Sequence, residues 1–139
     1  MGVDLRFSAL DDELSGMIFI KDGRAIIGVN RLHHPNRQRF TIAHELGHFV
    51  MHKPLITNEV HVDKQFKVLM RDSSAGTGSQ REEVEANQFA AALLMPEALV
   101  LKGIAEHTFD IDEENPLAEL AKQFKVSRQT MEYRVRNLA

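Results

Sequence analysis

The chain has 139 residues, enough for one domain with its own hydrophobic core, or for one small domain with an appendage. Charged residues make up 27% and hydrophobic residues 43%, which excludes a disordered acidic or basic tail protein. The formal net charge of −3 gives the whole chain no attraction for nucleic acid or anionic lipid. Because cysteine is absent, a disulfide framework, a thiolate zinc site and a cysteine nucleophile are excluded.

No apolar run approaches the ~18 residues that a membrane span needs, so we expect no membrane partner. The first residues carry early charges and lack the apolar stretch of a secretory signal. The sequence therefore predicts a cytoplasmic protein.

A β-hairpin is predicted near the start of the chain. Two short apolar runs, residues 17–20 and Ala25–Val29, flank a turn at Asp22-Gly23. Residues 1–14 mix apolar and acidic positions and favour no particular structure. The strand Ala25–Val29 is our candidate for an edge strand that pairs with an extended peptide substrate.

The first long helix is predicted from about Arg37 to His52, where apolar residues recur at three- and four-residue spacing. Asn36, which follows a proline, is expected to cap its start. His33 and His34 precede that proline, and we interpret them as surface residues. His52 is expected to cap the end of the helix rather than to bind a metal.

Shorter elements follow. In chain order they are strands at 60–62 and 66–70, a loop at 72–80 near the active-site cleft, a helix at 81–94, a further segment at 96–107, an acidic linker at 110–116, and helices at 117–124 and 127–138. We expect the loop at 72–80 to be disordered in the free protein, although it could act as a lid.

The sequence His44-Glu45-Leu46-Gly47-His48 lies within the first long helix. Residues i and i+4 of a helix are about 40° apart around its axis, so His44 and His48 project the same way and can hold one zinc ion. Glu45, beside the first histidine, can accept a proton from a water that the metal activates. A small Gly47 beside the histidines lets another element approach closely.

A catalytic zinc site of this kind needs a third protein ligand. Without cysteine, the following helix offers Glu82, Glu83 and Glu85, although acids are also common in a first helical turn. We prefer Glu83, because Asn87 stands one turn further on and can orient the ligand shell. Glu85 lies about 200° away from Glu83 around the helix, so the two cannot face one metal.

The His44–His48 segment and the helix that carries Glu83 together resemble a known family. Residues 37–52 (RQRFTIAHELGHFVMH) and 83–96 (EVEANQFAAALLMP) resemble the ImmA/IrrE family of metallopeptidases, and the similarity extends over residues 15–138. It implies a gluzincin-like zinc-peptidase domain with metal ligands at His44, His48 and Glu83 and a catalytic Glu45. Members of that family are regulatory proteases that cleave DNA-bound repressors or immunity proteins and switch on stress or mobile-element genes.

The last two predicted helices resemble a helix-turn-helix, with Ser127 capping the second. Arg128, Arg134 and Arg136 are the residues that would meet phosphates, but Glu132 lies among them. We therefore favour packing of these helices on the peptidase domain over DNA binding. The buried set would be Leu120, Phe124, Met131, Val135 and Leu138.

We expect an α+β fold in which a short mixed sheet packs on the active-site helices, with a peptidase domain at 1–109 and helix-turn-helix-like helices at 110–139. The predicted function is a zinc-dependent metallo-endopeptidase, with one Zn²⁺ per chain, that cleaves a helix-turn-helix repressor or antitoxin encoded nearby. The alternative is a non-catalytic, protease-like module that binds a repressor or DNA. A third interpretation, a toxin held inactive by its antitoxin, is a variant of the metallo-endopeptidase hypothesis.

The sequence is compatible with more than one metal and with more than one oxyanion donor. Availability and affinity decide whether zinc, manganese or another divalent ion is loaded. The group that stabilises the oxyanion is not identified; the possible donors are His61, Arg71, His107 and Tyr133.

Overall fold

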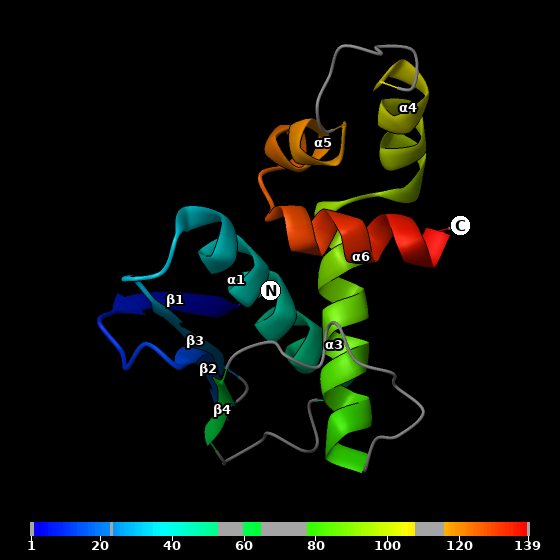
Figure 1. Ribbon diagram of the computed structural model, residues 1–139. Helices are drawn as coiled ribbons and strands as arrows, with labels where there is room; N and C mark the ends of the chain where they lie inside the picture. The colour runs from blue at the N-terminus through cyan, green and yellow to red at the C-terminus, as the bar shows by residue number, and fades with distance from the viewer. Residues whose placement is uncertain (1, 23, 53–59, 65–77, 108–115, 139) are drawn as a thin grey trace.

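The computed structural model describes residues 2–22, 24–52, 60–64, 78–107 and 116–138 (Figure 1). Its elements are β1 (Val3–Ser8), β2 (Leu14–Lys21), β3 (Arg24–Asn30), α1 (Pro35–Met51), β4 (Val60–Lys64), α3 (Gly78–Leu94), α4 (Glu97–His107), α5 (Pro116–Phe124) and α6 (Arg128–Leu138). The predicted α+β class is confirmed. The strand expected at 66–70 and most of the linker at 110–116 lie outside the described residues.

The strands form one mixed sheet in the order β1-β3-β2-β4. The predicted hairpin is confirmed as the antiparallel pair β2–β3, and Asp22 takes a positive φ of 52° at its turn. β1 pairs with β3 in parallel, so β3 has a neighbour on each side. The prediction that Ala25–Val29 is an edge strand is therefore wrong, and among the described strands the edges are β1 and β4.

Helix α1 covers one face of this sheet. The buried side chains beneath it alternate along β2 and β3: Ile18, Ile20, Ala25, Ile27 and Val29. Ile42, Leu46 and Phe49 pack on them from α1, and their spacing of four and three residues places them on one side of the helix. Burying each large aliphatic side chain contributes about 1.5–3 kcal/mol, so this interface holds the motif helix firmly against the sheet.

The start of α1 differs from the prediction. The helix begins at Pro35, which suits the first helical position because its missing N–H has no intrahelical partner there. Asn36 therefore lies inside the helix, and the cap is His34, whose Nδ1 accepts a hydrogen bond from the Asn36 N–H at 3.0 Å. His33 is not a surface residue: it is 7% exposed, and its Nε2 lies 2.9 Å from the Asp12 carbonyl oxygen.

The C-terminal helices lie at the end of α3 that points away from the sheet (Figure 1). Their core joins residues from α3 to α6: Ala91, Met95, Val100, Leu120, Ala121, Val126 and Met131 are buried, and Phe124, Val135 and Leu138 pack against them. Arg39 on α1 donates hydrogen bonds to the carbonyl oxygens of Phe124 and Lys125 at 2.8 and 2.6 Å. The end of α5 and the turn after it therefore contact α1, and Tyr133 of α6 packs against Phe40 and Ala43 of the same helix.

The turn between α5 and α6 is tightly specified. The Val126 N–H bonds to the Ala121 carbonyl and the Lys125 N–H to the Lys122 carbonyl, the Schellman pattern, with Lys125 at a φ of 57°. Ser127 caps α6 as predicted, because its Oγ accepts from the Thr130 N–H at 3.0 Å. The division into domains at residue 110 stays a prediction.

Met131→Ala tests the packing of α6. Met131 is fully buried, so its truncation should lower the free energy of unfolding by about 2–5 kcal/mol in urea titrations. Met51→Ala is the matched control, because Met51 is 45% exposed and should change stability by less than about 0.5 kcal/mol. Equal stabilities for the two variants would contradict the packing of α6 in this core.

Within the described parts of the chain, no single helix is long and apolar enough to span a membrane. Residues 80–94 and 97–106 meet the length and composition threshold only when counted as one pair, and they are bent by 58°.

Candidate metal centre

The site forms where α1 and α3 approach each other closely. Gly47 makes this approach possible: a Cβ atom there would lie 3.2 Å from the Cα and carbonyl oxygen of Ala86 and from Phe89 Cβ. Those distances are shorter than ordinary van der Waals contacts, so a larger residue would push the helices apart. The helix α3 begins at Gly78, three residues earlier than expected, so residues 78–80 are helical and only 72–77 of the predicted loop lie outside the described residues.

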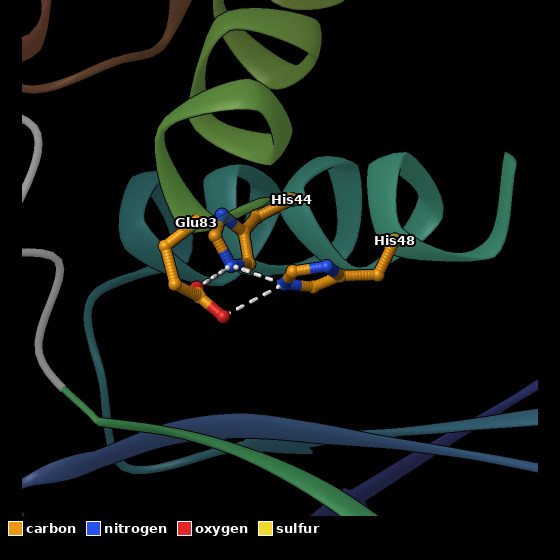
Figure 2. Close-up of side chains that lie close together, drawn as sticks. All are labelled: His44, His48 and Glu83. Carbon is orange, nitrogen blue, oxygen red and sulfur yellow. Dashed lines mark hydrogen bonds and ion pairs between the residues drawn. The ribbon is translucent and has the colours of Figure 1, made fainter. Parts of the chain in front are cut away.

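His44, His48 and Glu83 come together at this crossing, below the two helices and above the sheet (Figure 2). His44 Nε2 lies 2.9 Å from Glu83 Oε2 and 3.2 Å from His48 Nε2. His48 Nε2 lies 3.1 Å from Glu83 Oε1. Both imidazoles are buried, with side-chain exposures of 0% and 1%, while the Glu83 side chain keeps 21%.

These separations are those of ligands around one ion. Two atoms that each lie about 2.05 Å from a tetrahedral zinc are about 3.3 Å apart. The His44 Nε2–His48 Nε2 distance of 3.2 Å is close to this spacing, and the two imidazole nitrogens lie 2.9 and 3.1 Å from different oxygens of Glu83. Two imidazole nitrogens and one carboxylate oxygen are also the donor set that catalytic zinc sites use, so the residues fit a zinc ion.

Asn87 lies one helical turn after Glu83 and contacts His44. Its Oδ1 is 2.7 Å from His44 Nδ1, so the imidazole N–H can donate to the amide oxygen and leave Nε2 directed at the ligand group. Glu83 and Asn87 both belong to α3 and lie one turn apart, so the same helix supplies a ligand and the partner of His44.

The acids beside Glu83 have different positions. Glu85 points to the end of α1, where its Oε1 lies 3.1 Å from His52 Nε2. Among the described residues, the group that could hold a metal includes Glu83 and neither Glu82 nor Glu85. Glu83 and Glu85 are about 200° apart around the helix, and they accordingly contact different histidines. His52 is the C-cap residue of α1 as expected, but its contacts with His48 and Glu85 were not predicted.

Glu45 is completely buried, with 0% exposure. Neither carboxylate oxygen has a hydrogen-bond partner among the described residues. It lies beside the start of β2, since a Cβ atom at Gly16 would be 3.9 Å from Glu45 Cγ. A buried carboxylate without a partner is costly in a purely structural role, and such groups are retained where a water or an ion is handled.

Of the four possible oxyanion donors, the structure describes the side chain of Tyr133 only. Tyr133 packs against the cluster of Phe40, Ala43 and Ala90, in the helical part of the molecule. Arg71 and the side chains of His61 and His107 are outside what the structure describes.

The fold and this donor set define a small metallopeptidase-type domain. The chain belongs to the family described as the IrrE N-terminal-like domain, peptidase family M78, whose model matches residues 1–136. It is 30% identical over 141 aligned residues to the radiation response metalloprotease IrrE of Deinococcus radiodurans. That alignment covers 95% of this chain but 36% of the relative, so the chain spans about a third of the relative's length. The resemblance to the ImmA/IrrE family is confirmed.

Gly47→Leu tests the close approach of the helices. The added side chain must displace the α3 backbone at Ala86, which should lower the free energy of unfolding by about 1–3 kcal/mol and weaken zinc binding by moving Glu83. Thermal unfolding and chelator competition measure the two effects. Val50→Leu, at a site on the same helix that is 50% exposed, is the control and should change neither. Wild-type zinc affinity in Gly47→Leu would contradict the tight coupling of α3 to the site.

Proposed function

We propose that this chain is a zinc-dependent metallo-endopeptidase that cleaves a specific regulatory protein in the cytoplasm. The observation that carries the proposal is the buried, unpartnered carboxylate of Glu45 beside the converging His44, His48 and Glu83, as assessed over the described residues. A scaffold that only bound a partner would gain stability from an apolar or amide side chain at this position.

His44 Nε2, His48 Nε2 and one Glu83 oxygen would hold the ion. When bound, zinc lowers the pKa of a coordinated water toward ~7 and polarises a peptide carbonyl. Glu45 accepts the proton of the attacking water and later donates it to the leaving amine, the two halves of general acid–base catalysis.

The sheet edge at β4 is the part of the structure best suited to align an extended peptide. Gly16, which lies against Glu45, pairs with Asp63 of β4. Neighbouring strands are about 4.8 Å apart, so the β4 edge passes one strand spacing from Gly16 and is near the site. An added strand would gain backbone hydrogen bonds there, the usual way for a protease to bind an extended segment.

The regulatory role is proposed from similarity and from the C-terminal helices. The relative from Deinococcus radiodurans is named a radiation response metalloprotease, which supports a stress-linked substrate for this chain. Arg134 Nε donates to the Met95 carbonyl at 2.9 Å, and Arg136 pairs with Glu132 at 3.2 Å. Because Arg134 is bound to the backbone and the exposed Arg136 has an acidic neighbour, we propose a protein partner of the repressor or antitoxin type rather than DNA.

Co-expression with the product of the neighbouring gene tests the proposal. Intact-mass analysis should find two partner fragments whose masses add up to the intact partner plus one water. His44→Ala should leave the partner whole. If the partner stays intact with the wild-type chain and the regulatory response still occurs, the chain is a binding module and the proposed activity is wrong.

A further inference from the structure

A third histidine lies next to the ligand group. His52 is one helical turn after His48, is 6% exposed, and forms the C-cap of α1. Its Nδ1 lies 3.0 Å from His48 Nδ1, and its Nε2 lies 3.1 Å from Glu85 Oε1. His48, His52 and Glu85 therefore form a connected row that runs from the metal ligands to α3.

Only one arrangement of protons lets this row support metal binding. If His48 offers its Nε2 lone pair to an ion, its proton is on Nδ1. That N–H must then donate to the lone pair of His52 Nδ1. His52 consequently carries its proton on Nε2, where it donates to the Glu85 carboxylate. Each atom in the row then has a compatible partner.

The opposite arrangement is unfavourable for a ligand. A proton on His48 Nε2 would point into the group of donor atoms, 3.2 Å from His44 Nε2. A proton on His52 Nδ1 would face the proton on His48 Nδ1. Glu85 disfavours the tautomer of His52 that has its proton on Nδ1, because the Glu85 carboxylate is a strong acceptor and favours the tautomer with the proton on Nε2.

We propose that His52 and Glu85 are positioning residues that hold His48 with its proton on Nδ1 and its Nε2 directed at the metal. The inference rests on the proposed metal site and extends it. In this arrangement the His52–Glu85 pair orients the His48 ring through its Nδ1, as Asn87 orients the His44 ring through its Nδ1. Outer partners of metal-binding histidines fix the tautomer and the ring orientation, and losing one costs roughly 10–100-fold in metal affinity.

The test compares zinc affinity in the full chain by competition with a chelator. His52→Ala and Glu85→Ala should each weaken binding by about 10–100-fold. Glu82→Ala is the matched control, since it removes the same charge from the same helix and should change the affinity by less than about threefold. His52→Asn should recover much of the loss, because its Oδ1 takes the place of Nδ1 and can accept from His48. Circular dichroism checks that each variant keeps its helices.

Long-range ¹H–¹⁵N correlation spectra of the zinc-loaded chain show which ring nitrogen of His52 carries the proton. A role of His52 only as the C-cap of α1 would not fix this tautomer. We expect the proton of His52 on Nε2. A proton on Nδ1, or wild-type zinc affinity in both His52→Ala and Glu85→Ala, would overturn the positioning role while leaving the metal site intact. A wild-type chain that binds no zinc would instead overturn the metal site, and the positioning pair with it.

Discussion

Glu83→Ala should lose zinc affinity by more than the 10–100-fold that outer-sphere substitutions cost, because it removes a ligand atom rather than a support. The two remaining imidazoles hold an ion at two points only. His44→Ala and His48→Ala should abolish binding at micromolar zinc. Chelator competition or metal analysis after gel filtration measures all three, and the wild-type chain should retain about one zinc ion.

The neighbouring acids provide the control for this prediction. Glu82→Ala removes the same charge one residue away, so a similar loss would indicate a general electrostatic effect. Asn87→Ala should fall between control and ligand variants, since it leaves the ligand atoms in place but removes the partner of His44 Nδ1. Full occupancy in Glu83→Ala, together with loss in Glu82→Ala, would show that the ligand assignment is wrong.

The residues of the metal group could be predicted because helix geometry fixes them. A spacing of four residues places His44 and His48 on one face, and the same rule places Asn87 beside Glu83. The choice among three acids on α3 depended on that second spacing and on the resemblance of this chain to the ImmA/IrrE family. Helix periodicity also separated Glu83 from Glu85, although it did not indicate that Glu85 would contact His52.

The errors concern relations between elements distant in sequence. Periodicity identified β3 as a strand, but it carries no information on strand order, and β1 joined β3 in parallel at a side assumed to be open. β1 was also missed, although Val3, Leu5 and Phe7 alternate with charged residues as in a strand; in the structure Leu5 and Phe7 are 44% and 50% exposed, so this strand adds little to the core.

His33 escaped prediction for a similar reason. Its burial depends on Asp12 and Asn30, residues from another loop and from the end of β3. Asn30 is itself fully buried, and its Nδ2 donates to the Leu14 carbonyl at 2.9 Å. Local sequence signals cannot show such a contact, since it forms only once the sheet is assembled.

Glu45→Gln should separate catalysis from metal binding. Glutamine has nearly the shape of glutamate, so the packing beside Gly16 is preserved, and none of the three ligands changes. The amide cannot accept the proton of the attacking water, so the cleavage rate should fall by about 10²–10⁴-fold. Zinc stoichiometry, measured in the same preparation, should equal that of the wild-type chain.

The stability of this variant gives the decisive comparison. Glu45 is fully buried, and neither oxygen has a partner among the described residues, so a charge there costs free energy in the folded state. A neutral amide reduces that cost, and the melting temperature of Glu45→Gln should equal or exceed the wild-type value, as expected where an active site trades stability for function. A structural role predicts the reverse, a lower melting temperature with loss of zinc. Undiminished cleavage by a stable, zinc-loaded Glu45→Gln chain would remove Glu45 from the mechanism. An undiminished cellular response without cleavage would instead favour the binding-module alternative.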